Sequence, residues 1–334
     1  MTVAPQRRRT MRAIVRDRYG PADVLALRDD VQVPEITDDE VLVRVHAGGL
    51  DRGACHIMTG LPYLIRIAGF GVRAPKTAGL GSELAGVVEA VGAKVTHFKL
   101  GEAVYGVSNA AFAEYAPAHP EKLAPMPANL SFAQAAAVPV SAVTALQALR
   151  DRGRLKAGRH VLVIGASGGV GTYAVQIAKA LGATVTGVCS TAKLDLVRSL
   201  GADHVIDYTQ ADITDDGRRY DLVLDIGGNR RLSQLRRVLT PSGTLVIVGG
   251  EGGGRWTGGI HRQLSAIVLS LFVRQRLGTF VAKPNRADLD TLRALIQTGA
   301  ITPVIDRVIA LDGLPDAIRD LNAGHVRGKI VVVT

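Results

Sequence analysis

The sequence predicts a two-domain α/β protein in which a β-rich, mostly antiparallel domain is combined with a doubly wound parallel sheet. Its 334 residues are enough for two ordinary hydrophobic cores. Short strand-like segments separated by Pro and Gly occupy residues 11–131. From residue 132 onward, near-continuous apolar strands alternate with helical patterns, which is typical of a parallel sheet covered on both faces. We therefore expect a basic tail at 1–10, a first domain at 11–131 completed by 280–334, and a second domain at 132–279.

The first domain begins with a strand at Met11 to Val15 and continues through the segments "EVLVRVHA", "LAGVVEAVG", "EAVYGV" and "AFAEYA". The uncharged run that follows, at 131–149, contains Pro139 and several Ser, Thr and Gln residues. These residues favour a buried amphipathic helix over a membrane span.

The second domain contains five predicted strands, "HVLVIG", "ATVTGVC", "HVIDY", "YDLVLDIGG" and "GTLVIVGG". Helices are expected at 169–182, 191–200 and 229–239. After residue 285 the chain predicts a helix, a strand, a second helix and a final strand, "GKIVVVT", which return to complete the first domain.

A glycine turn joins the strand at 160–165 to the helix that begins near residue 169. Gly165, Gly168 and Gly171 follow a variant of the dinucleotide-binding spacing, and Gly169 lies among them. Glycine at 168 lets a pyrophosphate approach the backbone, and the helix N-terminus offers free N–H groups to it. Because strand, turn and helix lie inside an α/β run, a dinucleotide is expected here.

The next strand ends in "VCSTAK", where an NAD-binding site usually places Asp or Glu. This segment has no negative charge, and Lys193 adds a positive one. The pattern favours NADPH (NADP+) over NADH, although Lys193 is also compatible with an ordinary exposed helix residue.

Charge and cysteine content exclude several protein classes. Cys55 and Cys189 form neither a disulfide framework nor a CxxC metal site, which favours a reducing, cytoplasmic setting. The net charge is +10, and the first 20 residues supply six arginines and one aspartate. We read this as a solvated tail; nucleic-acid and membrane partners are not expected.

The segments "GASGGVGTYAVQIAK", "AGLGSELAGVVEAVG" and "GHVRGKIVV" resemble the medium-chain dehydrogenase/reductase superfamily, specifically its zinc-independent quinone oxidoreductase branch. The resemblance extends from Met11 to the C-terminus. It implies a GroES-like catalytic domain, a Rossmann cofactor domain and a cleft between them.

The resemblance also implies the cofactor contacts. The pyrophosphate would lie at the turn, formed by Gly165, Ser167, Gly168, Gly169, Val170 and Gly171. The 2′-phosphate would meet Ser190, Lys193 and Tyr208. The nicotinamide and its ribose would face Thr144, Asn229, Val248, Gly249 and Gly250, and Lys329 would close over the cofactor. Asn229 is equally compatible with a helix cap, and Tyr208 with a packed strand residue.

Asp51 and Ser82 match the positions at which zinc-dependent relatives have a cysteine and a histidine ligand. Neither residue type is a favoured zinc ligand, so no metal is expected. Hydride transfer to a quinone or an α,β-unsaturated carbonyl fits a metal-free site, because the acceptor spreads the developing charge. Tyr63 is the candidate proton or hydrogen-bond donor, and the alternative is a packed aromatic residue. His56 is a candidate proton relay, and the alternative is a histidine whose hydrogen bonds are satisfied within the fold.

Two other functions remain open. One is a zinc-free NAD(P)-dependent alcohol or aldehyde dehydrogenase, and the other is a non-catalytic, NADPH-responsive protein that binds RNA. Family habit further suggests a homodimer, with the apolar segment 261–277 either at the interface or buried beside the substrate cleft.

Overall fold

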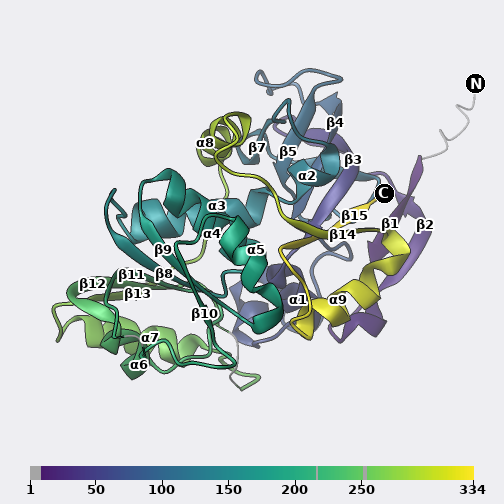
Figure 1. Ribbon diagram of the computed structural model, residues 1–334. Coiled ribbons are helices and arrows are strands. Elements are labelled where there is room, and N and C mark those ends of the chain that lie inside the picture. Colours follow the sequence, from purple (N-terminus) through teal and green to yellow (C-terminus); the bar gives the residue numbers. More distant parts are fainter. Residues whose placement is uncertain (1–8, 216, 251–253) are drawn as a thin grey trace, which may run out of the picture.

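The computed structural model describes residues 9–215, 217–250 and 254–334. Two large sheets organise this part of the chain, and they lie in separate halves of the molecule (Figure 1). One sheet is mainly antiparallel with seven strands, and the other is parallel with six. The predicted combination of a β-rich domain and a doubly wound parallel sheet is confirmed.

The seven-stranded sheet has the order β14-β15-β3-β4-β5-β7, and β6 pairs with β3. Its strands are β3 (Val41–Leu50), β4 (Glu83–Val91), β5 (Ala103–Val107), β6 (Tyr115–Ala118), β7 (Leu123–Pro125), β14 (Ile305–Ala310) and β15 (Lys329–Val333). β15 pairs antiparallel with β3, so the C-terminal strand joins this sheet. The boundaries at 132 and 280 stay a prediction.

A two-stranded hairpin, β1 (Thr10–Val15) and β2 (Ala26–Gln32), precedes this sheet. The guanidinium of Arg9 lies 4.3 Å from the ring centroid of Tyr115 and pairs with Glu89 at 3.0 Å. Residues 9 and 10 of the expected tail are therefore part of the fold, and residues 1–8 lie outside the described residues. The sequence does not predict β2, because "ALRDDVQ" lacks the alternation of apolar residues that marks a half-buried strand. In the structure this strand is largely exposed.

The run at 131–149 forms two helices, α2 (Phe132–Ala136) and α3 (Pro139–Gln147), so the prediction of one helix is wrong. Proline has no N–H and disfavours the helical conformation in the preceding residue, which places Pro139 at the start of a new helix. Ser131 begins α2 with a reciprocal capping box to Gln134. α3 is largely buried, as predicted, whereas two of the five residues of α2 are buried.

The parallel sheet has the order β10-β9-β8-β11-β12-β13. Its strands are β8 (His160–Ile164), β9 (Thr184–Cys189), β10 (His204–Asp207), β11 (Tyr220–Asp225), β12 (Leu239–Ile247) and β13 (Arg276–Thr279). β9 and β11 flank β8 on opposite sides, so the order reverses there and a crevice is expected at its carboxyl end. The edge strand β13 was not predicted, because its four residues carry no apolar run.

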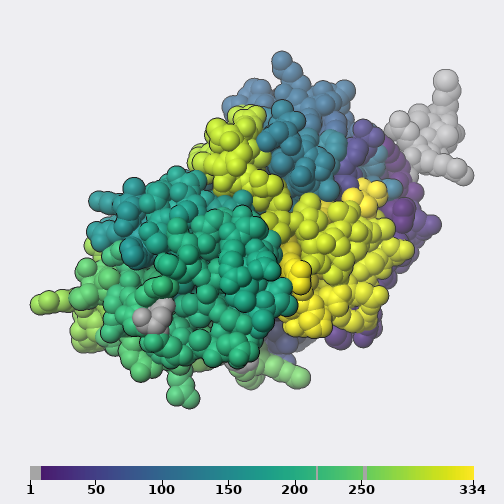
Figure 2. Space-filling view, viewed as in Figure 1, coloured from purple at the N-terminus to yellow at the C-terminus, as the bar shows by residue number. Residues whose placement is uncertain are grey.

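The helices of this half are α4 (Gly169–Ala180), α5 (Leu194–Ser199), α6 (Leu232–Arg237) and α7 (Ile260–Ser270), and the returning tail adds α8 (Arg286–Gln297) and α9 (Leu314–Asn322). One further helix, α1 (Arg52–Thr59), follows β3. Figure 2 shows the C-terminal residues, in yellow, between the green half with the parallel sheet and the purple N-terminal residues. Within the described parts of the chain, no helix is long and apolar enough to cross a bilayer.

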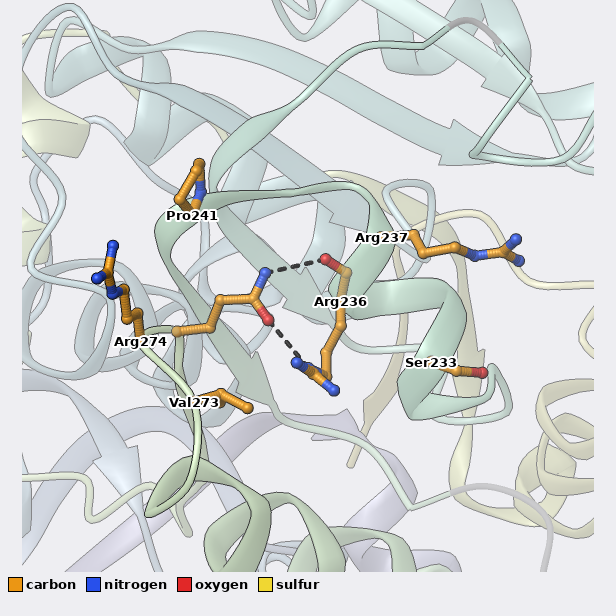
Figure 3. A pocket seen from close by; sticks show the side chains of 7 residues that line it. Ser233, Arg236, Arg237, Pro241, Val273 and Arg274 are labelled. Carbon is orange, nitrogen blue, oxygen red and sulfur yellow. Dashed lines mark hydrogen bonds between the residues drawn. The ribbon is translucent and has the colours of Figure 1, made fainter.

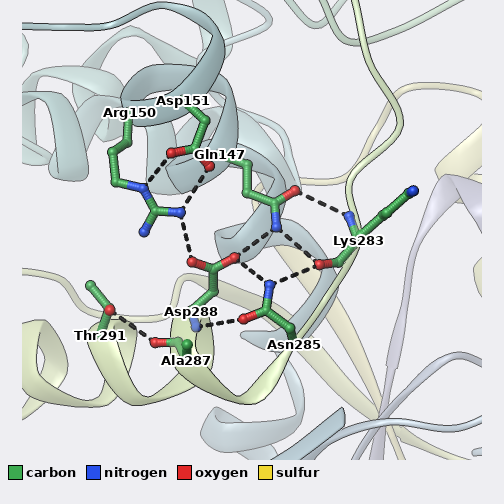
Figure 4. Close-up of polar contacts among 8 residues, drawn as sticks. All are labelled: Gln147, Arg150, Asp151, Lys283, Asn285, Ala287, Asp288 and Thr291. Atoms are coloured by element: carbon green, nitrogen blue, oxygen red, sulfur yellow. Dashed lines mark hydrogen bonds and ion pairs between the residues drawn. The ribbon is translucent and has the colours of Figure 1, made fainter. Parts of the chain in front are cut away.

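A buried carboxylate fastens the returning tail to α3 (Figure 4). Asp288 accepts hydrogen bonds from Gln147 (2.7 Å), Arg150 (2.7 Å) and Asn285 (2.7 Å). Burial opposes the ionisation of Asp288, but these hydrogen bonds outweigh it and hold its pKa below the ordinary value. The ionised carboxylate therefore stabilises the junction between α3 and α8.

We expect Asp288→Asn to lower the free energy of unfolding by about 1–3 kcal/mol at neutral pH. A carboxyl whose folded pKa is depressed stabilises above its unfolded pKa of about 3.9, and this stabilisation is lost as pH falls through the folded value. Urea unfolding at several pH values should show the wild-type advantage disappearing in acid. Asp195→Asn is the control, because Asp195 is 98% exposed beside Arg198. An equal loss in both variants would contradict the assignment.

Candidate functional site

The glycine turn lies at the carboxyl end of β8, where the sheet order reverses. Gly165 has a φ of +85°, which favours glycine. A Cβ at Gly171 would stand 2.1 Å from the Gly165 carbonyl oxygen, so only glycine allows α4 to pack this closely. A Cβ at Gly168 would meet nothing but that oxygen, at 3.6 Å. The turn is thus closed toward the protein and open at Gly168, the residue that precedes α4.

The residues at the start of the last strand, β15, contact the turn. Gly328 N–H donates to the Ser167 carbonyl at 2.9 Å, and Gly168 forms a bridge with Gly328. A Cβ at Gly169 would approach Lys329 Cδ at 3.0 Å and Ser141 Oγ at 3.2 Å. The Lys329 side chain therefore lies next to Gly169 of the turn.

The ammonium of Lys329 forms a buried ion pair with Glu83 of β4. Both side chains are almost fully buried, and the other Glu83 oxygen accepts from the N–H groups of Val140 (2.7 Å) and Ser141 (3.2 Å). Burial raises the pKa of Glu83 to about 7, and the Lys329 charge acts in the opposite direction. The sequence suggests that Lys329 closes over a cofactor; the structure instead places its charge against a carboxylate that sequence reasoning missed.

Ser190, Lys193 and Tyr208 gather at the adjoining ends of β9 and β10. Tyr208 N–H donates to the Cys189 carbonyl at 3.1 Å, and the Tyr208 side chain is 56% exposed, so it is not a packed strand residue. Lys193 Nζ donates to the carbonyls of Gly324 and Val326, at 2.8 Å each. Lys193 thereby ties this corner to the C-terminal segment.

Arg327 is the residue that sequence reasoning missed at this corner. Burial lowers the pKa of Lys193, and the nearby positive charge of Arg327 lowers it further. The Arg327 side chain is exposed. Two carboxylates belong to this corner. Asp306 accepts from the Arg327 N–H at 3.0 Å, and its charge raises the pKa of Lys193, against the effects of burial and Arg327. Asp207 accepts from the Thr191 and Thr209 hydroxyls, and the Thr191 hydrogen bond lowers its pKa. The signal for Arg327 was present in "HVRGKIVV", two residues before Lys329.

The other end of the turn leads to the loops that follow β11 and β12. A Cβ at Gly249 would meet the Ile226 carbonyl at 2.0 Å, so these two loops touch through their backbones. Beneath them, buried Asp225 accepts from Gly228 N–H (3.1 Å) and pairs with Arg262 of α7 (2.5 Å). Sequence reasoning missed this supporting pair.

Three predicted contacts lie around these loops. Asn229 is exposed and does not cap α6, whose N-cap residue is Arg231, so the helix-cap reading of Asn229 is not realised. Val248 N–H donates to the Asp225 carbonyl at 2.9 Å, which fixes the start of the run 248–250. Thr144 is 8% exposed and donates its hydroxyl proton to the Val140 carbonyl at 2.6 Å, leaving only acceptor capacity for another group.

Tyr63 and His56 lie on the catalytic-domain side, at and after α1. Nδ1 of His56 hydrogen-bonds to the Leu61 carbonyl at 3.0 Å, two residues before Tyr63. Among the described residues, no hydrogen bond involves the Tyr63 hydroxyl. The ring of Tyr63 packs against Arg66 (4.8 Å) and Trp256 (5.1 Å). His56 thus supports the turn that carries Tyr63.

Asp51 begins α1, and its Oδ1 accepts from Ala54 N–H at 2.9 Å. Its Oδ2 is buried and, within the described residues, has no hydrogen-bond partner. Asp51 is close enough to Glu83 to raise the pKa of that carboxyl. In the described parts of the chain, no three His, Cys, Asp or Glu residues are placed to hold a metal ion.

A separate hollow of about 480 Å³ lies among Ser233, Arg236, Arg237, Pro241, Val273, Arg274 and Gln275 (Figure 3). Gln275 holds this region together by accepting from Arg236 Nε at 3.0 Å and donating to the Arg236 carbonyl at 3.0 Å. These residues lie at the amino ends of β12 and β13. The glycine turn is at the opposite edge of the same sheet, so this hollow is not part of the candidate site.

Two family models match the chain. The alcohol dehydrogenase GroES-like domain matches residues 37–148, and the zinc-binding dehydrogenase model matches residues 200–332. Together they cover parts of both halves of the fold.

Curated proteins and solved structures match over nearly the whole chain. A relative described as NADPH-dependent alkenal/one oxidoreductase, chloroplastic, from Arabidopsis thaliana is 34% identical over 336 residues, covering 96% of this chain and 79% of its own. Quinone oxidoreductase from Mus musculus is 32% identical over 339 residues, covering 97% and 98%. The structure of the quinone oxidoreductase from Coxiella burnetii superposes with a TM-score of 0.87 at 28% identity, covering 98% and 100%.

Proposed function

We propose a function from the premise that this chain belongs to the medium-chain dehydrogenase/reductase superfamily and is quinone oxidoreductase-like. The protein is an NADPH-dependent reductase that acts on quinones or α,β-unsaturated carbonyls. The observation that carries the proposal is the open residue Gly168 at the N-terminus of α4, beside a corner with exposed positive charge. The names of two relatives, an alkenal/one oxidoreductase and a quinone oxidoreductase, support the same substrate classes.

The residues present fit a dinucleotide. The space next to Gly168 would be filled by any Cβ, and the first N–H groups of α4 point out of the helix end, where a pyrophosphate is favoured. We assign Ser190, Lys193, Tyr208 and Arg327 to the 2′-phosphate, and the run 248–250 with Asn229 to the nicotinamide side. NADPH, when bound, supplies the hydride.

The chain itself has two tasks on the substrate side. It must hold the acceptor against the cofactor cleft and donate a hydrogen bond to the oxygen on which negative charge develops. We propose Tyr63 for the donor, because its hydroxyl has no hydrogen-bond partner within the described residues. His56 holds the Leu61 carbonyl and so positions the Tyr63 turn; a relay role for His56 stays a prediction.

We propose that the reaction needs no zinc. Asp51 caps α1 with one carboxylate oxygen, and Ser82 offers only a hydroxyl at the other position. The test is NADPH oxidation after EDTA treatment, with NADH in parallel and a quinone, an enone and an aldehyde as acceptors. Quinone or enone turnover supports the proposal. Turnover of the aldehyde alone, or only after zinc is restored, would assign the chain to the alcohol dehydrogenase alternative.

We expect Arg327→Gln to raise the KM for NADPH roughly tenfold and to leave the KM for NADH within about twofold, because one charge-assisted contact to phosphate is worth about 1.5–3 kcal/mol. Arg327 has no ion pair among the described residues, so the fold should tolerate the change. Arg237→Gln, at the opposite edge of the sheet, is the control. If both KM values rise together in the Arg327 variant, the 2′-phosphate does not lie at this corner.

We propose a homodimer formed through α7 and β13. The outer face of α7 and its end expose Leu264, Ile267, Val268, Leu271 and Phe272, with exposed fractions from 45% to 79%, so the buried reading of this segment is wrong. β13 pairs only with β12 among the described strands, which leaves an edge that a two-fold copy can extend. The same surface appears on both copies, as a two-fold interface requires.

Sedimentation velocity should give a mass near twice 35.2 kDa for the wild type. Phe272→Glu should shift the protein to the monomer, since burying an unpaired carboxylate in an apolar interface is costly. Leu100→Glu, at a residue that is 72% exposed in the other domain, should remain dimeric. A monomeric wild type, or dimers in both variants, would overturn this interface.

A further inference from the structure

Trp256 is the single tryptophan of the chain, and 74% of it is exposed. It lies on the segment 254–259, between the end of β12 and the start of α7. A large ring with an apolar body and an N–H donor gains most when one face is covered. Its exposed surface is therefore available to a ligand or a partner surface.

The segment that carries Trp256 crosses to the catalytic domain. Tyr63 N–H donates to the Arg255 carbonyl at 2.8 Å, and the Tyr63 and Trp256 rings meet edge to face with centroids 5.1 Å apart and planes at 70°. A Cβ at Gly258, which has a φ of +55°, would stand 3.2 Å from Pro62 Cγ. We call these five residues, 62, 63, 255, 256 and 258, the cross-domain clasp.

The clasp adjoins the nicotinamide side of the site. A Cβ at Gly259 would come within 2.8 Å of Gly250 Cα, so the residue after the clasp packs on the glycine end of β12. The segment that carries Trp256 thus contacts both the loop of the proposed donor Tyr63 and the residues assigned to the nicotinamide.

A second residue, Arg66, also contacts Tyr63. The Arg66 guanidinium lies 4.8 Å from the Tyr63 centroid and 4.3 Å from the Tyr19 centroid. Arg66 Nε also donates to the Gly60 carbonyl at 3.0 Å. Because the Tyr63 ring contacts both Arg66 and Trp256, it is held in place, whereas Trp256 remains 74% exposed.

We propose that Trp256 is a specificity-determining residue whose free indole face stacks on the ring of a planar substrate. The inference rests on the proposed function and narrows its substrate class to ring systems, quinones and aryl enones, over small acyclic enones. Stacking would hold such a ring beside the Tyr63 hydroxyl. A short acyclic enone gains little from an indole face and binds without it.

Steady-state kinetics with a naphthoquinone and with methyl vinyl ketone test this selection. We expect Trp256→Ala to raise the KM for the naphthoquinone by roughly three- to tenfold, the value of one aromatic pair, with kcat unchanged and the methyl vinyl ketone KM within about twofold. Trp256→Phe should restore most of the loss. Leu100→Ala is the matched control, because Leu100 is 72% exposed and lies far along the chain from the clasp. Equal effects on both acceptors, or none on either, would overturn the proposal.

Fluorescence supplies a readout that does not need turnover. With one tryptophan in the chain, all indole emission reports position 256. We expect the naphthoquinone to quench it saturably at an unchanged lifetime, as a stacked complex requires. Linear quenching with a shortened lifetime would show collisions alone and overturn the inference. If the wild type reduces neither acceptor yet is quenched saturably, the proposed function fails and the ring-binding inference stands.

Discussion

Replacing Gly168 with alanine is expected to leave the fold intact and to weaken NADPH binding by about tenfold or more, which corresponds to about 1.4 kcal/mol. Gly168 has φ −87° and ψ 178°, which alanine adopts without strain. The added methyl would meet only the Gly165 carbonyl oxygen, at 3.6 Å, an ordinary contact. Outside the protein, however, it would occupy the space at the N-terminus of α4 where we place the pyrophosphate.

Gly171→Ala provides the contrast, because its methyl would clash with the protein rather than with the cofactor. A Cβ there would lie 2.1 Å from the Gly165 oxygen and 2.7 Å from Ala166 Cα, both backbone atoms. We expect a loss of about 1–3 kcal/mol in the free energy of unfolding, since α4 must move away from β8. Thermal unfolding with and without NADPH, together with a titration of NADPH, separates the two effects.

The deciding measurements are the melting temperature and the NADPH affinity of the Gly168→Ala variant, taken together. An unchanged melting temperature with weaker binding places the cofactor at the open side of the turn. An unchanged affinity would mean that the phosphates do not approach Gly168, and the dinucleotide assignment of the turn would have to be abandoned.

Most of the fold could be predicted because many of its strands are recognisable from the pattern of their own residues. The buried strands β8, β9 and β11 are continuous apolar runs, and glycines mark the turn after β8. Strands without such a pattern were missed: β2 is largely exposed, and β13 is only four residues long. Both are defined by their pairing partners, which local sequence does not reveal.

The candidate site could be predicted only where its residues come from one continuous segment of the chain. The glycine turn is a single stretch of chain, so its spacing could be recognised. The direction of Lys329 depends on Glu83, 246 residues away, and no pattern near either residue signals the pair. The contact of Tyr63 with Trp256 likewise joins two domains. Long-range partners decide where these side chains point.

The buried pair of Lys329 and Glu83 should give the largest loss of stability, about 3–5 kcal/mol for Lys329→Met, because one buried charge is left without its partner. The pair joins β15, β4 and, through Glu83, the N–H groups of Val140 and Ser141 beneath the glycine turn. Lys179→Met is the matched control: Lys179 pairs with Asp203, but each side chain is 35% exposed, so a loss of at most about 1 kcal/mol is expected. Equal losses in the two variants would show that burial of the Lys329 pair is unimportant.

The pH dependence of Lys329→Met gives a second test with a definite sign. Burial already raises the pKa of Glu83 to about 7 while Lys329 opposes the rise, so removing the ammonium must raise it further. A carboxyl with a raised folded pKa is protonated at little cost in acid, and stability falls as pH rises from its unfolded pKa through the folded value. The loss in free energy of unfolding of the variant relative to the wild type should therefore be larger at about pH 8.5 than at about pH 6.

The double variant with Glu83→Gln is the control, because it has no ionisable group at position 83. It should lose this pH dependence, and its loss of stability should be smaller than the sum of the losses from the two single changes. A deficit independent of pH would mean that Glu83 is not the group left uncompensated.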